Sequence, residues 1–153
     1  MSLRSGAVAL ARLRVAGGGL EPAAVAALGE NRVRDAGLTR QKARYVTELA
    51  GAIVDGRFDL AAIGRWGDEE GRRALTDRVG IGPWTADIYL LMALGRPDVW
   101  PAGDLALAAA LVRAKALAAR PDSPAQLAIA AAWRPWRSVA ARILWHAYLA
   151  GER

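Results

Sequence analysis

The run Val79-Gly80-Ile81-Gly82-Pro83-Trp84-Thr85-Ala86 constrains this chain more than any other segment. It follows a stretch typical of a helix, residues 68–79, and it precedes another, residues 85–94. Glycine readily adopts backbone dihedrals that other residues resist, and proline fits the first turn of a helix because no N–H is needed there. The sequence therefore predicts two helices joined by a tight Gly-Ile-Gly hairpin. The free N–H groups at the start of the second helix suit a phosphate group.

Apolar residues recur at helical spacing along most of the chain. A clear case is the helix expected over 39–55, which Thr39 can cap. Its apolar face consists of Val46, Leu49, Ala50 and Ile53. The other predicted helices cover residues 2–15, 22–28, 30–36, 59–64, 68–79, 85–94, 105–119, 123–133 and 135–150. Residues 85–94 are almost wholly apolar, which predicts a helix buried on all sides. No segment alternates with strand periodicity for long, so we expect an all-α fold in one domain spanning residues 1–153.

Composition excludes several kinds of site. The chain has no cysteine, which rules out disulfides, thiolate zinc sites, cysteine nucleophiles and iron–sulfur clusters. The single histidine, His146, makes no zinc site and is expected to be packed or on the surface. No apolar run approaches the ~20 residues that span a bilayer. Arg4, Arg12 and Arg14 interrupt any secretory signal, so a cytoplasmic protein is predicted.

The net charge of +6 and the pI near 10.7 favour a polyanionic partner such as nucleic acid. The same charge is also typical of a solubilising surface in an arginine-rich proteome, so charge alone leaves both interpretations open. Arg40, Lys42 and Arg44 decorate the first turns of the helix over 39–55. A solvated basic face explains them more readily than contacts with phosphate.

Two acidic residues lie close to apolar helices. Asp104 precedes the helix that starts at Leu105, where an N-cap contributes about 1 kcal/mol. Spacing alone favours this capping role. A carboxylate at a helix N-terminus can also act on a positive charge that develops opposite it, so capping and catalysis are compatible. Asp87, inside the apolar helix over 85–94, is expected to form a buried ion pair with an arginine.

Three segments in this order resemble the helix-hairpin-helix DNA glycosylases of the HhH-GPD superfamily, and within them the 3-methyladenine DNA glycosylase II group. They are the hairpin at 79–86, the acid in Pro101-Ala102-Gly103-Asp104 and the tail Trp133-Arg134-Pro135-Trp136-Arg137-Ser138. The resemblance covers nearly the whole chain and is weakest before Gly29. It implies an all-α glycosylase domain of about eight to ten helices. It also implies base-excision repair of alkylated purines such as 3-methyladenine, with double-stranded DNA containing a damaged base as the partner of a monomer.

The resemblance gives Asp104 a catalytic role, because the acid at this motif position acts in catalysis in the family. An anion opposite the sugar stabilises the positive charge that develops as the glycosidic bond breaks. Relatives that also cleave the strand carry a nucleophilic lysine at the position that matches Trp84. Tryptophan supplies no amine for a Schiff base. The resemblance therefore implies a monofunctional glycosylase, in which water completes the reaction and an abasic site remains.

The same resemblance implies a base pocket formed by Trp84, Ile88 and Trp145. Electron-rich rings favour a base made cationic by alkylation, through stacking and cation–π attraction. For Trp84 the alternative is packing of the hairpin, and for Trp145 packing in the core is equally open. Ile88 stands where some relatives place an aromatic residue. Trp133 and Trp136 are expected to brace the last two helices.

The hairpin is also implied as the DNA grip, because its backbone amides bind a phosphate without reading sequence. The implied DNA-binding residues are Gly80, Ile81, Gly82 and Thr85. No cofactor is required, but the family holds a monovalent cation, Na⁺ or K⁺, on hairpin carbonyls. Here these would be the main-chain carbonyls of Thr76, Arg78 and Gly80. Arg78 and Val79 differ from the commoner apolar-Pro pair of the family, a change that carbonyl ligation tolerates.

The front of the chain departs from the family. Members usually have a helix before Ser2, and its end supplies the wedge that fills the gap left by a flipped base. Here Met1-Ser2-Leu3 begins inside that turn, which implies exposed apolar surface and weakened base flipping. Two other functions therefore stay open. One is a DNA-binding module without catalysis, and the other is a structural domain in which the hairpin and Asp104 are only a turn and a cap.

Overall fold

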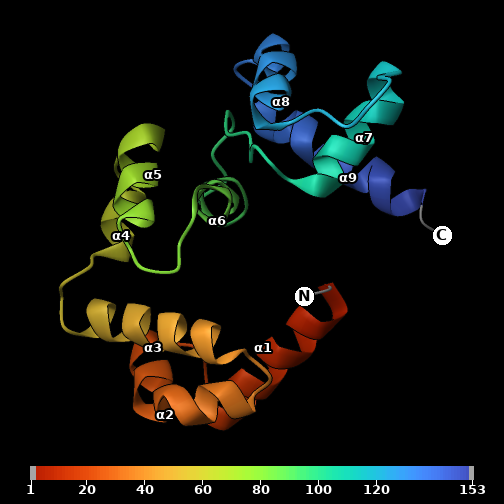
Figure 1. The fold of residues 1–153 in the computed structure, drawn as a ribbon. Coiled ribbons are helices and arrows are strands. Elements are labelled where there is room, and N and C mark those ends of the chain that lie inside the picture. Colours follow the sequence, from red (N-terminus) through yellow and green to blue (C-terminus); the bar gives the residue numbers. More distant parts are fainter. Residues whose placement is uncertain (1–2, 152–153) are drawn as a thin grey trace. The chain divides into compact units, whose positions relative to one another are not determined.

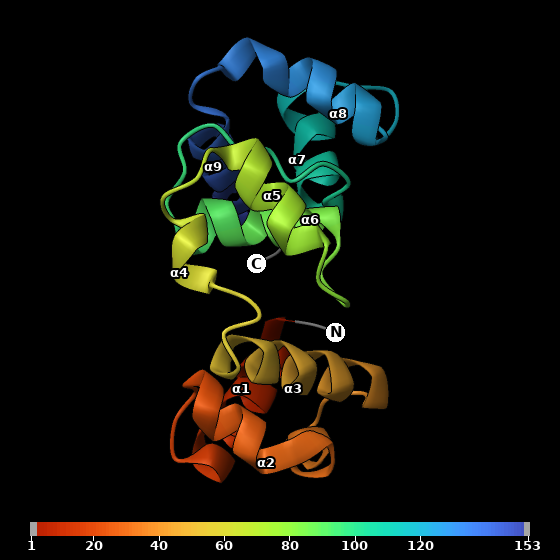
Figure 2. The same cartoon turned by 90° about the vertical axis from the view of Figure 1, so that its left-hand side faces the viewer.

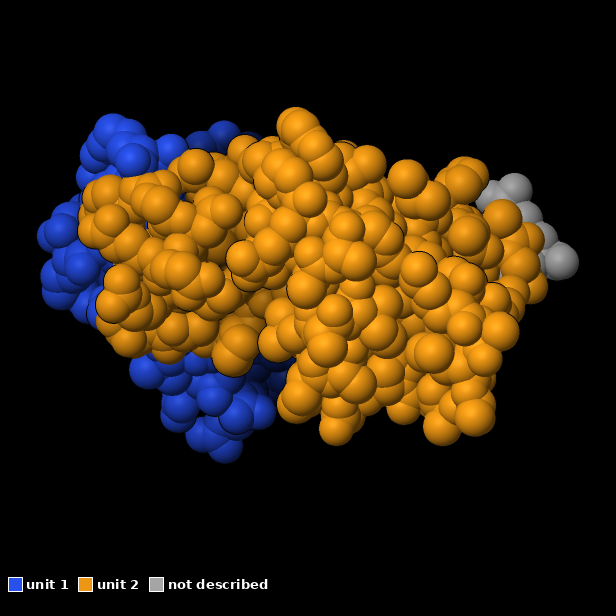
Figure 3. Space-filling model, turned by 90° about the horizontal axis from the view of Figure 1, so that it is seen from above, with its two compact units in different colours: residues 1–65, 78–80 blue, residues 66–77, 81–153 orange. Residues whose placement is uncertain are grey.

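The computed structural model describes residues 3–151, and the chain in this range forms helices joined by short connections, with no strand (Figure 1). This confirms the all-α prediction. The chain divides into two compact units, coloured separately in Figure 3. Unit 1 comprises residues 1–65 and 78–80, and unit 2 comprises residues 66–77 and 81–153. No helix in the described part of the chain is long and apolar enough to cross a membrane. The expected shortened turn at Met1-Ser2 lies outside the described residues.

The described part of unit 1 contains four helices, and α2 packs against both α1 and α3 (Figure 1). Their bounds are α1 (Leu3–Gly17), α2 (Pro22–Asp35), α3 (Arg40–Val54) and α4 (Leu60–Ile63). Thr39 caps α3 as predicted, because its hydroxyl accepts from the Lys42 N–H at 3.3 Å. Asp59 caps α4 in the same way. The core of the unit consists of Leu13, Val25, Leu28, Val33, Ala36, Ala43 and Ala50.

Gly29 interrupts α2, where the sequence predicts one helix ending and another beginning. Its φ of 69° and ψ of 167° are not helical, so the segment consists of two helical pieces with a kink between them. The positive φ is the reason a glycine stands at this position. The sequence therefore located the break correctly, although the two pieces follow each other without an intervening loop.

Unit 2 contains the remaining helices. They are α5 (Asp68–Thr76), α6 (Pro83–Ile88), a π-helical turn η1 (Tyr89–Ala93), α7 (Leu105–Lys115), α8 (Ser123–Ala130), a 3-10 turn η2 (Ala131–Trp133) and α9 (Arg137–Ala150). Helix α5 packs against α6, and α7 packs against α9 (Figure 2). The largest side chains buried in this unit are Leu75, Leu90, Leu91, Trp100, Leu107 and Leu111. These packed helices fix the place of the residues between α6 and α7.

Helices α5 and α7 end three and four residues earlier than predicted. Helix α5 stops at Thr76 instead of Val79, because the chain leaves the helix after Asp77 and turns into the hairpin. Helix α7 stops at Lys115 instead of Ala119, because Ala116 adopts a left-handed conformation with φ of 49°. Such a residue terminates a helix, and it is usually glycine or asparagine. An alanine there gives no signal in the sequence.

Two predictions about burial were wrong. The helix over 85–94 is not buried on all sides, since Ala86, Leu90 and Leu91 are buried whereas Met92 is 52% exposed. Apolar composition alone cannot reveal which face of such a helix meets its neighbours. Trp133 does pack in the unit, with its ring 5.6 Å from that of Trp100. Trp136 is 60% exposed, so its side chain is not packed between the last two helices as predicted.

Asp87 forms the predicted buried ion pair. Its side chain is 6% exposed, and Arg72 Nε donates to Asp87 Oδ1 at 2.6 Å. Arg72 also bonds Glu69, within the same helix α5, at 2.9 Å. Burial raises the pKa of Asp87 above its ordinary value of 3.8, and the contact with Arg72 opposes that rise. The pair therefore ties α5 to α6 in the low-dielectric interior of unit 2.

We predict that Arg72→Met destabilises unit 2 by about 3 kcal/mol at pH 7, because it leaves a buried carboxylate unpaired. Urea unfolding followed by tryptophan fluorescence measures this, since all six tryptophans lie in unit 2. Without Arg72 the pKa of Asp87 rises further, so the folded state holds a proton that the unfolded state releases. The deficit should therefore grow from pH 5 to pH 7. Arg73→Met, at the exposed neighbouring position, is the matched control and should cost far less.

Candidate functional site

Asp104 stands at the N-terminus of α7, at the end of a tight turn. Gly103 just before it has a φ of 85°, and a Cβ there would lie 3.0 Å from Ser123 Oγ, so the turn requires glycine. Oδ1 of Asp104 accepts from the Leu107 N–H at 2.8 Å, which is the predicted N-cap. The side chain is half-buried. The cap engages one of the two carboxylate oxygens and accounts for only part of the surroundings of Asp104.

Two indole rings complete these surroundings. Trp84 Nε1, at the start of α6, donates to Asp104 Oδ2 at 2.9 Å. Trp145 Nε1, on α9, donates to Asp104 Oδ1 at 3.2 Å. One carboxylate therefore receives three N–H donors that come from three helices, with two on Oδ1 and one on Oδ2. Bonds from N–H donors to an ionised acceptor are stronger than neutral ones. The structure thus brings together Asp104, Trp84 and Trp145, which the sequence predicted for one site.

The segment that leads to Asp104 is pinned to the helices beside it. Arg137 of α9 donates to both carboxylate oxygens of Asp98, from Nε at 2.7 Å and from Nη2 at 3.0 Å. These bonds lower the pKa of Asp98. Ser138 Oγ accepts from the Val99 N–H at 2.9 Å. Further along, the Gly103 N–H donates to Oε1 of Gln126, a buried residue of α8, at 3.3 Å. The loop before α7 is therefore fixed at three points.

Sequence reasoning assigned no role to these supporting residues. Arg137 and Ser138 belong to the tail segment on which the family resemblance rests. The sequence therefore marked this segment, but it did not show that the two residues hold the loop before Asp104. Gln126 has no signal, because a glutamine in an alanine-rich helix is ordinary. Its importance comes from its burial, with 2% of the residue exposed, and from its bond to the turn before Asp104.

The other predicted pocket residue lies one helical turn from Trp84. Ile88 is half-buried at the end of α6, and residues four apart lie on the same side of a helix. Trp84 is 47% exposed, so the ring that bonds Asp104 also meets solvent. Trp145 is half-buried, and its bond to Asp104 shows that it does more than fill the core. His146 beside it is exposed.

The hairpin uses its two glycines differently. Gly80 has a φ of 87°, and a Cβ there would collide with the ring of Tyr45 in unit 1, so both its conformation and its contact require glycine. Gly82, the N-cap of α6, has a φ of −86° and a ψ of 171°, which any residue can adopt, and a Cβ there would meet nothing within 4 Å. The expectation of special dihedrals was therefore right for Gly80 and wrong for Gly82. Thr85, in the first turn of α6, is exposed.

The backbone of the hairpin keeps polar groups available. Within residues 3–151, the N–H groups of Gly80, Ile81 and Gly82 donate to no backbone or side-chain acceptor. The carbonyl oxygens of Thr76, Arg78 and Gly80 likewise accept no backbone hydrogen bond in that range. Unpaired amides suit an anion, and hard carbonyl oxygens suit a cation such as Na⁺ or K⁺. The hairpin therefore has amide donors of the kind that the predicted phosphate contact requires, and carbonyl oxygens of the kind that the predicted cation site requires.

The structure combines an all-α fold, a glycine hairpin and an aspartate that caps a helix and accepts hydrogen bonds from two indoles. These features are the basis for comparing the chain with known protein families. Residues 3–138 match the family of HhH-GPD superfamily base excision DNA repair proteins. The match covers most of the sequence. The chain therefore belongs to the HhH-GPD superfamily, as its hairpin, aspartate and tail segments indicate.

Individual relatives agree with this assignment. The chain is 32% identical over 125 residues to Bacillus subtilis YfjP, named as a candidate DNA-3-methyladenine glycosylase, a match that covers 82% of this chain and 44% of YfjP. The structure of a Bacillus halodurans DNA-3-methyladenine glycosidase superposes with a TM-score of 0.78 at 25% identity, over 97% of this chain and 69% of that one. The Schizosaccharomyces pombe 3-methyladenine DNA glycosylase Mag1, solved in complex with abasic DNA, has the same fold, with a TM-score of 0.87 at 24% identity over 95% of this chain and 72% of that one. The chain spans less than half the length of YfjP.

We predict that Gly80→Ala costs more than about 1 kcal/mol of stability, because alanine resists the positive φ and its Cβ meets the Tyr45 ring. Gly82→Ala is the matched control, made two residues away with the same added methyl group, and should stay close to the parent. Thermal unfolding followed by far-UV circular dichroism compares the two variants. Equal stability of both would contradict this account of the hairpin.

Proposed function

We propose that this protein is a monofunctional DNA glycosylase that hydrolyses the N-glycosidic bond of alkylated purines, such as 3-methyladenine, in double-stranded DNA. One observation carries the proposal: a half-buried carboxylate, Asp104, is held by two indole N–H groups and a helix N-terminus. Membership of a family of base-excision repair proteins supports it. A carboxylate in simple capping needs only the backbone donor, so the two tryptophans indicate a site built around the charge.

Asp104 is the group proposed to act on the sugar. As the bond between C1′ and the purine nitrogen breaks, its electron pair leaves with the base and the sugar becomes positively charged. A fixed anion lowers the energy of that oxocarbenium-like state. Water then adds its oxygen to C1′, and its proton passes to a base such as Asp104 or to solvent. A purine methylated on N3 is already cationic, so it departs as a neutral base without prior protonation.

Trp84 and Trp145 are proposed to have two functions. Their N–H groups orient the carboxylate, because both donors are engaged by Asp104. The ring faces then remain for the flipped base, and a cationic base is attracted to an indole face. Ile88 adds an apolar wall one turn from Trp84. Recognition through ring faces reads charge and shape more than the hydrogen-bonding edge of the base.

The absence of strand cleavage is part of the proposal. Schiff-base chemistry needs an amine near C1′, and Trp84 occupies the hairpin position where relatives with lyase activity carry lysine. The chain has only two lysines. Lys42 lies in unit 1, and the Lys115 Nζ lies 5.3 Å from the centre of the Trp133 ring. Neither residue belongs to the group around Asp104.

The hairpin is proposed to hold the DNA backbone. Its unpaired N–H groups at Gly80, Ile81 and Gly82, with Thr85 beside them, are donors for a phosphate oxygen. The carbonyls of Thr76, Arg78 and Gly80 would hold a structural Na⁺ or K⁺, which would fix the hairpin and strengthen the local positive field. No step of the hydrolysis requires this ion.

A DNA-binding module without catalysis is the second candidate, and abasic-site formation distinguishes it from an enzyme. The placement of Trp84 and Trp145 on Asp104 favours the enzyme, because binding to a phosphate backbone has no use for an oriented carboxylate. The parent chain should release methylated purine from alkylated duplex DNA and leave abasic sites without strand breaks. Binding of that DNA without any release of base would support the module instead.

We predict that Asp104→Asn lowers single-turnover excision by at least about a hundredfold while DNA affinity stays near the parent value. The amide has the size of the carboxyl group but carries no charge. Gel analysis of abasic sites measures the rate, and fluorescence anisotropy measures binding. Excision at the parent rate would remove Asp104 from the mechanism.

This variant needs a control, because the amide introduced at position 104 cannot satisfy all three donors. If its oxygen takes the place of Oδ1, its NH₂ group faces the Trp84 N–H, and two donors oppose each other. The double variant Asp104→Asn, Trp84→Phe removes that conflict but does not restore the charge. The double variant should regain stability and stay inactive. Recovery of excision in the double variant would show that the conflict, and not the lost charge, had caused the defect.

We predict that Trp84→Phe and Trp145→Phe each lower the single-turnover rate about tenfold or more, because each loses one hydrogen bond to a charged group. Phenylalanine keeps an aromatic face, so binding should change less than the rate. A second variant replaces each tryptophan with benzothienylalanine, which has the shape of tryptophan but has sulfur in place of N–H. It therefore removes the hydrogen bond and keeps the stacking surface. Full activity of that variant would limit the indoles to stacking.

A further inference from the structure

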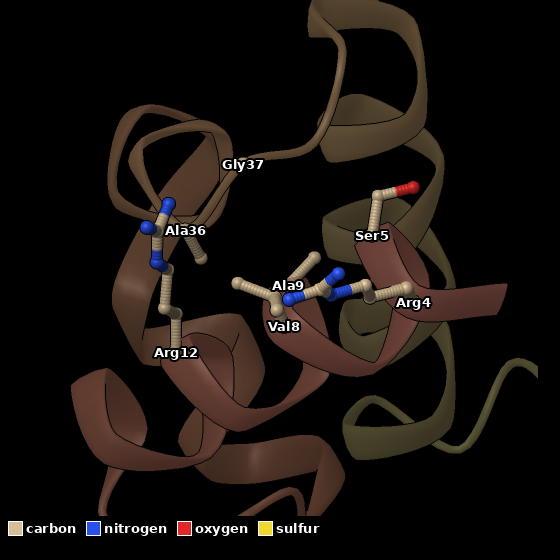
Figure 4. Close-up of a pocket in the computed structure, with 7 residues that line it drawn as sticks. All are labelled: Arg4, Ser5, Val8, Ala9, Arg12, Ala36 and Gly37. Carbon is tan, nitrogen blue, oxygen red and sulfur yellow. The ribbon is translucent and has the colours of Figure 1, made fainter. Parts of the chain in front are cut away.

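Unit 1 contains a pocket that the proposed reaction does not use (Figure 4). It encloses about 350 Å³ between α1 and the residues that follow α2. Val8, Ala9 and Ala36 provide apolar walls, and Arg4 and Arg12 provide the charge. The two arginines and Val8 follow one another at intervals of four residues, so they lie along one side of α1.

The two arginines have no acidic partner within residues 3–151. In the described part of the chain neither Arg4 nor Arg12 forms an ion pair, and no carboxylate lines the pocket. Gly37, whose φ of 107° favours glycine, lies next to one of them, because a Cβ built there would be in ordinary contact with Arg12 Nη1 at 3.8 Å. In Figure 4 the Arg12 side chain stands beside Ala36. The pocket therefore presents two guanidinium groups whose donors are available to a ligand.

A second cavity in unit 2 provides the contrast. It encloses about 690 Å³ and is lined by four arginines and four acidic residues. Arg137 is paired there with Asp98, and Arg72 with Glu69. Charges of both signs cancel within that cavity. Of these two cavities, the pocket on α1 is the one that combines a concave surface with an uncompensated positive charge.

Positive charge is also concentrated in unit 1 when the whole sequence is counted. Unit 1 holds 11 of the 21 lysines and arginines but 6 of the 15 acidic residues, a net charge of +5 out of +6. Helix α1 itself has three arginines and no acidic residue. Guanidinium groups bind phosphate through paired N–H donors, and a cluster of like charges is stabilised when an anion binds between them.

We infer that the pocket formed by Arg4, Val8 and Arg12 is a phosphate-binding site that contacts the sugar–phosphate backbone of DNA outside the site at Asp104. The guanidinium groups bind phosphate oxygens, and Val8 with Ala36 meets the apolar face of a deoxyribose. The site adds affinity without sequence preference. The inference rests on the DNA-binding part of the proposed function and is independent of the role of Asp104.

The test compares two double variants that remove the same charge. Arg4→Gln with Arg12→Gln alters the pocket, whereas Arg14→Gln with Arg32→Gln removes two exposed arginines of unit 1 that are outside the pocket and have no ion pair among the described residues. Binding of undamaged duplex DNA is measured by fluorescence anisotropy from roughly 50 to 300 mM salt. The pocket variant should bind roughly tenfold more weakly, and the slope of log K against log salt should become shallower by about 1.8. The control variant should keep the slope of the parent.

Three further measurements make the outcome decisive. Far-UV circular dichroism should show that both variants are folded. Single-turnover excision at saturating DNA should be unchanged in the pocket variant, which separates this inference from the role of Asp104. Calorimetry with inorganic phosphate should show no tight binding, as expected for a site that needs the polyanion. An unchanged slope, an equal change in both variants, or tight phosphate binding with unaltered DNA affinity would each overturn the inference.

Discussion

The convergence of three N–H donors on the carboxylate of Asp104 is the interaction that constrains the arrangement of helices in unit 2. The donors come from the start of α6, the first turn of α7 and the middle of α9. A carboxylate can satisfy all three because it has two oxygens and no hydrogen of its own. No neutral side chain of the same size does so. The helices must therefore be placed accurately with respect to one another, and the remaining contacts of the unit provide that accuracy.

The supporting contacts are mostly polar and reach across long stretches of sequence. The ion pair of Arg137 with Asp98 and the bond of Ser138 to Val99 attach the loop before α7 to the start of α9. Gln126 holds the turn at Gly103 from the other side. A rigid loop lowers the entropic cost of keeping one carboxylate in one orientation. In the proposed mechanism this orientation is what directs the negative charge at the sugar.

Many features of this protein follow from local patterns that the sequence displays. Proline at the first position of a helix, glycine in a left-handed turn and aspartate at an N-cap act through their nearest neighbours along the chain. The local roles of Thr39, Gly29, Gly80 and Asp104 could therefore be predicted correctly from the residues around them. The predictions failed where the residues nearby in sequence give no indication of the local structure or of the burial. The end of α7 at Ala116, the exposed face of the helix at Met92 and the ordinary dihedrals of Gly82 have no local signal.

The sequence by itself determined the all-α fold, the helix-hairpin-helix segment, the cap at Asp104 and the family to which the chain belongs. Only the tertiary structure decided that Trp84 and Trp145 direct their N–H groups at the same carboxylate, and that Gln126 supports the turn before it. It also decided that Arg4 and Arg12 share a pocket with no acidic partner among the described residues. The reason is physical. A cap or a turn is formed by residues a few positions apart, whereas these contacts depend on how helices distant in sequence pack against one another.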